Sequence, residues 1–413
     1  MTGFETLNRR RLMTGLAGGG LLGLGGCATA LTPARPATPS AAPPYVTPFA
    51  ERRPPIAPVH ARMDRVFDIT VCLRPFRATG PRLDAEQVGD TLVVHNYGHG
   101  GSGWSLSWGS GTFAVRKAMA GSPASVAVVG CGALGLTSAL LAQEAGAKVT
   151  IYAKDLLPDT RSARATGSWT PDSRIALTDS VGPEFAAQWE EMARISFKRF
   201  RRYLGLPGDP IEWSDRYYLQ DPPASTPGLV PMPVPPQAGA PLEFATYGER
   251  IRDITPRPEI LPAGATPFSD GPVRRTSLMQ YNVADYAHTL MADFLAAGGR
   301  VERREFHSLS DLAGLKEKVV INCPGYGARA LCKDESVTPV RGQIGWLIPQ
   351  PEVNYGVYYR NVSMLSRRDG IVVQALWGGD MFGFGNDQEV IDRAETEHAI
   401  SILAELYGRM TAG

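Results

Sequence analysis

The chain has 413 residues, of which 43% are hydrophobic and 20% are charged, and its formal net charge at pH 7 is +1. This length and composition are typical of a globular, enzyme-sized protein with room for two domains. A net charge near zero gives no electrostatic reason to expect binding to nucleic acid or to an anionic surface. The five cysteines show no CxxC spacing, so the sequence indicates neither a disulfide framework nor a metal site.

The N-terminal region is not expected to belong to the folded part. Residues 8–13 (NRRRLM) precede a glycine-rich, modestly apolar run, the arrangement of a twin-arginine export signal. The segment 24–27 (LGGC) resembles a lipobox, in which Cys27 would carry a lipid anchor. A membrane-spanning anchor is the alternative, but the many glycines make a weak span. We therefore expect a signal peptide over 1–27, a Pro-rich linker over 28–58, and a periplasmic or membrane-anchored protein.

A glycine-rich loop follows the apolar run over 91–94. Residues 95–109 (HNYGHGGSGWSLSWG) contain five glycines among polar and aromatic residues. Glycine at this density lets backbone N–H groups approach a ligand closely and adopt positive φ without steric cost. A strand that runs into such a loop indicates a site built from main chain. His95 and His99 are four residues apart, but the glycines around them argue against a helix that presents both to a metal.

The next elements predict a βαβ unit. An apolar strand over 125–129 leads into the segment 130–135 (GCGALG), which opens a helix, and a second strand covers 148–152. In a G-x-G-x-x-G turn the glycines allow close approach to a pyrophosphate, which the helix N-terminus faces. With these flanking elements at the right spacing, the motif predicts a dinucleotide-binding fold. Lys154 stands where a ribose-binding acid is expected, and Asp155 follows it.

The remaining sequence alternates between helices, strands and turns. The Pro-rich stretch over 222–241 is expected to be a surface loop, and its role stays open. The other expected elements, in chain order, are a small-residue turn over 160–171, an amphipathic helix over 183–204, a helix over 281–295, a strand over 300–302, a turn within 318–327, strands from 341, over 356–359 and over 371–374, and a helix over 398–410.

The loop over 95–109 closely resembles the signature loop of the D-amino-acid oxidase family, which lies along the isoalloxazine ring of FAD. Segments 160–171 and 318–327 resemble that family's other flavin-contacting turns, and 341–344 (RGQI) matches the strand that enters its substrate sheet. The pattern departs at Gly111, where the family has alanine. The resemblance implies an α/β fold, with a Rossmann-like FAD-binding domain and a second substrate domain on a mixed, largely antiparallel sheet. The motifs together imply FAD as the cofactor and name as its contacts Gly100, Gly103, Trp104, Ser105, Gly130, Gly132, Ala133, Leu134, Gly135, Lys154, Asp155, Thr166, Gly167, Ser168 and Gly325.

The order of the matching segments differs from that of the family. There, the substrate arginine and the signature loop follow the helix that comes after the substrate sheet. Here the chain ends with that helix, and the matching pieces lie within 62–120. We therefore predict a circular permutation in which 62–120 supplies the family's C-terminal part and 125–413 carries the FAD-binding domain interleaved with the substrate domain. Two unrelated domains in tandem are the alternative, which would leave the signature loop without a flavin.

The resemblance also implies the chemistry, which is oxidation of a D-amino acid by hydride transfer from its Cα to flavin N5, with dioxygen as the oxidant and hydrogen peroxide as a product. Arg74 stands where the family's carboxylate-binding arginine stands, and its planar fork suits a carboxylate. Gly101 matches the glycine whose carbonyl receives the substrate amine. The family's two pocket tyrosines fall near Arg360 and at Met364, which leaves Tyr359 as the candidate hydroxyl.

Several alternatives remain open at this point. Arg77 and Arg82 are expected to form structural ion pairs rather than to hold substrate. A D-aspartate oxidase, or another amine oxidase of the same fold, stays possible because the residues around the substrate side chain are not placed. A non-catalytic flavin-containing binding or sensor lipoprotein is the alternative of another class, motivated by the lost tyrosine and the lipobox. Neither the preferred D-amino acid nor the oligomeric state follows from the sequence.

Overall fold

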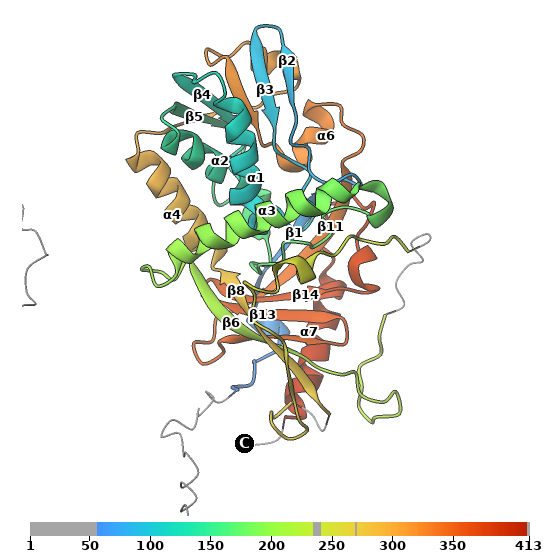
Figure 1. Cartoon of the computed structure of the whole chain (residues 1–413). Coiled ribbons are helices and arrows are strands. Elements are labelled where there is room, and N and C mark those ends of the chain that lie inside the picture. The colour runs from blue at the N-terminus through green and yellow to red at the C-terminus, as the bar shows by residue number, and fades with distance from the viewer. Residues whose placement is uncertain (1–55, 234–240, 269–270, 411–413) are drawn as a thin grey trace, which may run out of the picture. The chain divides into compact units, whose positions relative to one another are not determined.

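Two β-sheets organise the part of the chain that the computed structural model describes, residues 56–233, 241–268 and 271–410 (Figure 1). These residues belong to one compact unit. The expected export signal, Cys27 and most of the linker lie outside the described residues. None of the helices in the described ranges combines the length and the apolar character needed to cross a membrane.

The smaller sheet contains the expected βαβ unit. Its strand order is β2-β3-β10-β4-β5-β9, and all neighbours run parallel except β2 and β3. Its strands are β2 (Ala85–Val88), β3 (Thr91–His95), β4 (Ser125–Val129), β5 (Lys148–Ala153), β9 (Arg300–Arg303) and β10 (Val319–Asn322).

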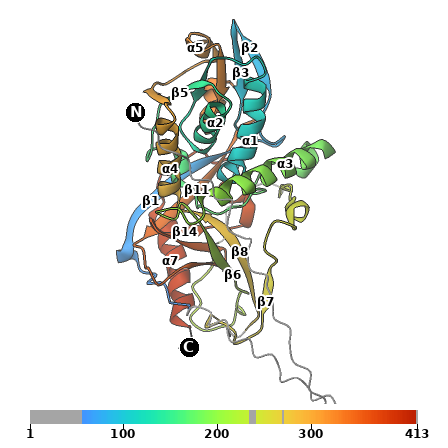
Figure 2. The same ribbon diagram turned by 60° about the vertical axis from the view of Figure 1, so that its left-hand side comes forward.

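Helices cover both faces of this sheet, as buried parallel strands require. On one face, Val126 and Val128 pack into the core with α1 (Gly103–Ala118), α2 (Ala133–Glu144) and α4 (Val283–Ala296). Figures 1 and 2 show α2 between α1 and α4. On the other face, Ala127 and Val129 pack with α5 (Leu309–Ala313) and α6 (Ala328–Leu331).

The larger sheet is mixed and largely antiparallel, as predicted for the substrate domain. Its order is β1-β11-β14-β13-β12-β6-β8-β7, and only β12 and β6 run parallel. Its strands are β1 (Val66–Phe76), β6 (Ile211–Tyr218), β7 (Glu259–Leu261), β8 (Val273–Tyr281), β11 (Thr338–Leu347), β12 (Tyr355–Tyr359), β13 (Val362–Arg367) and β14 (Gly370–Ala375).

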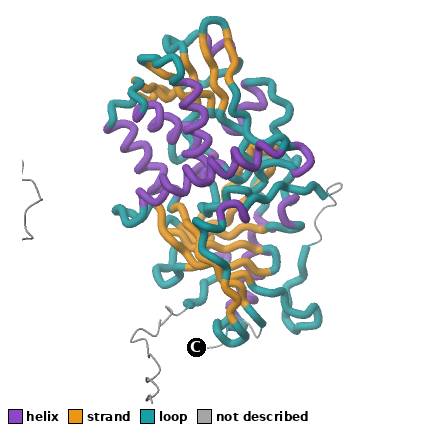
Figure 3. Tube along the Cα trace, in the orientation of Figure 1, coloured by secondary structure: helices purple, strands orange, loops and turns teal. Residues whose placement is uncertain are grey.

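One face of the larger sheet packs on α7 (Arg393–Gly408), where Leu403 and Leu406 meet the buried side chains of Val357, Met364 and Val373. Because side chains alternate along a strand, residues such as Ser363 and Gln374 point to the opposite face. A further helix, α3 (Pro183–Phe200), packs against α1. Figure 3 shows most helices gathered about the smaller sheet, with the strands of the larger sheet below them.

The segment before residue 120 is built into both sheets. β1 pairs along its length with β11, and β3 lies beside β10. The alternative of two separate domains in tandem does not fit this pairing. One boundary differs from expectation, because the loop predicted over 95–109 ends at Ser102. From Gly103 onward the chain is helical, and the apolar side chains of Leu106 and Trp108 are buried in the core.

Candidate active site

A cavity of about 1150 Å³ is lined by residues of both sheets. Its lining includes residues at the carboxyl ends of β4, β5 and β10 on one side, and residues of β1, β6, β13 and β14 on the other. Pockets for single small molecules commonly measure about 300–1,000 Å³. This cavity therefore has room for a dinucleotide together with a small substrate.

The G-x-G-x-x-G turn forms the first wall of the cavity. Gly130, Gly132, Ala133 and Leu134 line it, whereas Gly135 lies beneath the turn. Gly130 has φ +98°, and a Cβ there would lie 2.3 Å from the carbonyl oxygen of Cys323. A Cβ on Gly135 would lie 2.0 Å from the carbonyl oxygen of Gly130. Only glycine fits these two positions, and the turn leaves the N-terminus of α2 facing the cavity, where a pyrophosphate would be stabilised.

The end of the second strand supplies a charged pair. Lys154 and Asp155, which were predicted to contact FAD, both line the cavity. Lys154 Nζ lies 2.6 Å from Oε1 of Glu305, which also lines the cavity from the segment after β9. The sequence analysis did not single out Glu305, because it lies 151 residues after Lys154 and belongs to no motif of its own. A carboxylate is thus present at this end, although not at the position where the motif places it.

The glycine-rich loop forms the second wall. Gly100, Gly101, Gly103 and Trp104 line the same cavity as the G-x-G-x-x-G turn, whereas Ser105 lies beneath the surface. A Cβ on Gly100 would lie 1.9 Å from the carbonyl oxygen of Arg174, and one on Gly101 would lie 2.5 Å from Ser173 Oγ. The loop therefore packs against the turn over 170–174 too closely for side chains.

The small-residue turn completes the flavin-sized part of the cavity. Thr166, Gly167 and Ser168 line it, and Gly325 lines it from the turn after β10. Gly167 has φ +88°, and a Cβ there would lie 2.5 Å from the carbonyl oxygen of Tyr281. Buried Ser105 supports this turn, since its Oγ accepts a hydrogen bond from the backbone N–H of Thr170 at 2.8 Å. Segments far apart in sequence thus meet as the resemblance implied.

His99 is a buried polar group that the sequence analysis did not assign. His99 is one of the residues that line the cavity, and neither of its buried ring nitrogens has a hydrogen-bond partner among the described residues. Burial lowers the pKa of this histidine to about 3, so the ring is neutral at physiological pH. Buried polar groups are almost always paired. A polar ligand in the cavity would give this ring a partner.

Arg74 lies on the opposite side of the cavity, on β1. Its Nη1 donates to the carbonyl oxygen of Arg341 at 3.2 Å. The guanidinium lies over Gly342 of the neighbouring strand, where a Cβ would be 2.3 Å from Arg74 Nη2. No carboxylate of the described residues lies within ion-pair distance of Arg74. Its planar fork is therefore available to a carboxylate ligand.

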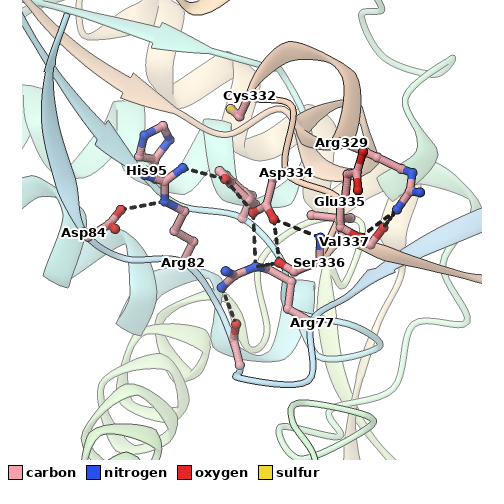
Figure 4. A network of polar contacts seen from close by, with 12 residues as sticks. Arg77, Arg82, Asp84, His95, Arg329, Cys332, Asp334, Glu335, Ser336 and Val337 are labelled. Atoms are coloured by element: carbon pink, nitrogen blue, oxygen red, sulfur yellow. Dashed lines mark hydrogen bonds and ion pairs between the residues drawn. The ribbon is translucent and has the colours of Figure 1, made fainter. Parts of the chain in front are cut away.

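The two arginines that follow have protein partners, which confirms their predicted structural role (Figure 4). Arg77 Nε lies 3.2 Å from Asp334 Oδ2, and Arg82 Nε lies 2.8 Å from Asp84 Oδ1. The hydroxyl of Tyr97 accepts from Arg82 at 3.1 Å and donates to Asp334 at 3.0 Å. This network ties the glycine-rich loop to the segment before β11.

The structure does not bring Tyr359 to the cavity. Its hydroxyl donates to Glu405 Oε1 at 2.8 Å on the face of the sheet that α7 covers. Met364 is fully buried on that same face, whereas Ser363 lines the cavity. Met364 therefore faces away from the cavity, and its neighbour Ser363 faces toward it. A shift of one residue along a strand moves a side chain to the opposite face of the sheet.

Two of the other arginines that line the cavity are buried, and the sequence analysis singled out neither. Arg174 is buried, and its Nη2 lies 3.0 Å from Asp380 Oδ1. Burial and the charge of Arg74 lower the pKa of Arg174 to about 10. Arg216 of β6 is also buried and donates from Nη2 to Ser168 Oγ at 2.5 Å. Neither arginine belongs to a motif. The only signal in the sequence is that each is a charged residue among residues that become buried.

Comparisons with known proteins identify the family of this chain. Residues 125–412 match the family described as FAD dependent oxidoreductase. The D-amino-acid oxidase of Streptomyces coelicolor is 29% identical over 227 residues, which cover 53% of this chain and 58% of that protein. The D-amino-acid oxidase of Rubrobacter xylanophilus is 32% identical over 220 residues, which cover 52% and 57% of the two chains. The chain thus spans somewhat more than half the length of these curated relatives.

Among solved structures, iminodiacetate oxidase from a Chelativorans species aligns with 15% identity and a TM-score of 0.47, over 69% of this chain and 79% of that chain. The family match covers well over half of the present sequence. This protein belongs to the family of FAD-dependent oxidoreductases, and its cofactor is FAD.

Proposed function

We propose that this protein oxidises D-amino acids to 2-imino acids, with dioxygen as the final oxidant and hydrogen peroxide as the second product. The observation that carries the proposal is Arg74, a cavity-lining guanidinium with no acidic partner among the described residues. Relatives named D-amino-acid oxidase support the choice of substrate. When bound, FAD supplies the hydride acceptor and passes the two electrons to dioxygen.

The cavity offers a consistent set of contacts to FAD. The turn from Gly130 to Leu134 and the N-terminus of α2 would hold the pyrophosphate, and the segment with Lys154 and Glu305 would hold the adenosine end. The loop from Gly100 to Trp104 and the turn with Gly167 would lie along the isoalloxazine ring. These walls are largely backbone, and at Gly100, Gly130 and Gly167 a side chain would meet a carbonyl oxygen.

The protein's own contribution to the reaction is to orient the substrate. Arg74 would bind the α-carboxylate through two parallel hydrogen bonds, which fixes the direction of the Cα–H bond. The carbonyl of Gly101 would accept from the substrate amine. Ser363 would offer a single hydroxyl on the sheet, in the region where the family places a tyrosine.

The test uses the purified holoenzyme and matched enantiomers. We expect D-alanine to bleach the visible flavin absorbance without oxygen, and to release hydrogen peroxide with oxygen, while L-alanine does neither. Purified protein without flavin absorbance, or flavin that no D-amino acid reduces, would contradict the proposal. The second result would favour the binding or sensor lipoprotein.

We also propose that segment 62–120 is the family's C-terminal part in a permuted position. The family match begins at residue 125, yet β1 and β3 pair with strands of the matched region. A variant that carries residues 56–120 after residue 410, joined by a flexible linker, should bind FAD and keep activity. A variant that folds but binds no FAD would count against the permutation.

Export by the twin-arginine route is a further proposal, which rests on the sequence around Arg9, Arg10 and Arg11 alone. Replacement of all three by lysine should retain the protein in the cytoplasm of the producing cell. Unchanged export in a cell fractionation would contradict it. A Cys27→Ser variant would separately test the lipid anchor.

A further inference from the structure

We propose that Arg216 binds a carboxylate on the substrate side chain, so that this enzyme prefers acidic D-amino acids such as D-glutamate and D-aspartate over their amides. The inference rests on the proposed function and names the substrate class of the same site. It assigns a specificity-determining role to a residue outside every motif of the sequence.

Arg216 is a buried cation without an acidic partner. Its residue surface is only 8% exposed, yet it lines the cavity. Its Nε has no hydrogen-bond acceptor, and the rest of the guanidinium bonds only to neutral hydroxyls, with Nη2 donating to Ser168 and Tyr218 as a further partner. No carboxylate of the described residues lies within ion-pair distance of it. A buried charge is costly unless it is paired, which points to an anion supplied by the ligand.

The acids on the same strand are already engaged elsewhere. Asp215 points to the other side of β6, where Ser277 Oγ donates to its Oδ1 at 2.5 Å and Arg275 lies at 3.5 Å. Glu212 accepts from Asn282 Nδ2 at 2.7 Å. Neither acid neutralises Arg216, so the cavity around this arginine lacks a balancing negative charge.

Arg216 and Arg74 lie in similar surroundings on the larger sheet. Each guanidinium lies over a glycine of a neighbouring strand, Arg74 over Gly342 and Arg216 beside Gly356, where a Cβ would be 3.2 Å from its Nε. Both lie on the face of the larger sheet that points away from α7, together with Ser363 and therefore toward the cavity. One sheet face thus presents two cations to one space.

The glycine-rich loop connects the two arginines. At its start, the N–H of Gly100 donates to the carbonyl oxygen of Pro75, next to Arg74. In the first turn of α1, which follows the loop, Ser105 Oγ donates at 3.4 Å to the carbonyl oxygen of Ser168, whose hydroxyl contacts Arg216. The segment from Gly100 to Ser105 therefore contacts neighbours of both arginines, and both arginines line the same cavity.

The other buried arginine of the cavity does not have this character. Arg174 Nη2 makes no hydrogen bond, but Arg174 already has an ionic partner, because Asp380 Oδ1 lies 3.0 Å from Nη2, and its Nε donates to the carbonyl oxygen of Asp380 at 2.7 Å. Arg216 is not placed to bind the pyrophosphate of FAD either. The turn at Gly130 and the N-terminus of α2, which would hold the pyrophosphate, follow β4 of the smaller sheet, whereas Arg216 lies on the larger sheet. The lining on the larger sheet is also polar, with Ser363 and Gln374, which suits a charged side chain better than an apolar one.

The test compares substrates of matched shape and different charge. We would measure kcat/KM by peroxide release for D-glutamate against D-glutamine and for D-aspartate against D-asparagine, with D-alanine as the reference. A desolvated pair at Arg216 should favour at least one acid over its amide by about a hundredfold. Arg216→Met should remove most of this preference while D-alanine activity stays within about threefold of wild type.

A matched control is Arg275→Met on the neighbouring strand, which removes an arginine that is already paired with Asp215 and Glu259. It should leave the ratio of acid to amide unchanged. Equal activity on acids and amides in the wild type would overturn the inference. A loss in Arg216→Met that is the same for every substrate would also overturn it, because it would indicate a structural or flavin-directed role.

A binding measurement separates this inference from the proposed function. If no D-amino acid reduces the flavin, the proposed function fails, and the flavin absorbance still reports binding of glutarate against that of butyrate. Tighter binding of glutarate that is lost in Arg216→Met would support the second anion site. Equal binding of the two acids would reject it.

Discussion

The two ends of the cavity differ in whether backbone or side chains form their walls. The nucleotide end consists of backbone turns, in which Gly130 and Gly167 have positive φ and pack against carbonyl oxygens. The substrate end consists of side chains on one sheet face, among them Arg74, Arg216 and Ser363. A wall made of backbone fits a ligand of one shape and tolerates almost no substitution. A wall made of side chains on strands can come to bind a different ligand through a single substitution.

The largest effect is expected at the nucleotide end. Gly130→Ala would force a side chain into a backbone of φ +98° and against the carbonyl oxygen of Cys323. Strain alone costs about 1–3 kcal/mol, and the displaced turn should lose FAD altogether. The measurement is flavin content after purification, with Gly121→Ala as a control because its Cβ would meet nothing within 4 Å. Normal flavin content in Gly130→Ala would contradict the account.

A smaller effect is expected at Gly342, which supports the substrate end. In Gly342→Ala the new Cβ would displace the guanidinium of Arg74, the far end of a flexible side chain. We expect an apparent KM for D-amino acids about tenfold higher, or about 1.4 kcal/mol, with flavin content unchanged. If flavin were lost while the KM of the remaining holoenzyme stayed normal, the two ends would not be separate in the way described.

The third effect is on stability and not on ligand binding, and it concerns His99, whose folded pKa of about 3 lies below the value of about 6.5 expected in the unfolded chain. The unfolded state binds the proton first, so this group's contribution to stability is full above about pH 6.5 and falls by about 1.4 kcal/mol per pH unit below it. Urea unfolding of the apoprotein should show a gentler loss of stability on acidification in His99→Gln. Identical slopes for both proteins would contradict the burial of a neutral ring.

The same contrast explains what the sequence could predict. The nucleotide end lies in contiguous motifs, so Gly130, Gly132 and the glycine-rich loop could be assigned from spacing and flanking elements. The substrate end depends on which face of a strand each residue occupies and on which strands become neighbours. Met364, the position expected for a pocket tyrosine, and its neighbour Ser363 lie on opposite faces of the sheet, and nothing in the sequence around Arg216 shows that it faces the cavity.

The central claim is that Arg74 holds the substrate carboxylate while other parts of the chain hold FAD. The most direct measurement is the dependence of flavin reduction on D-amino acid concentration, without oxygen, in Arg74→Ala holoenzyme. Loss of a desolvated, charge-assisted pair of about 2–5 kcal/mol predicts a half-saturating concentration tens- to thousands-fold higher, with flavin content unchanged. Arg74→Lys should recover only part of this loss, and Arg77→Ala, whose arginine pairs with Asp334, should have a milder effect. A half-saturating concentration within about threefold of wild type for every D-amino acid tested would contradict the claim.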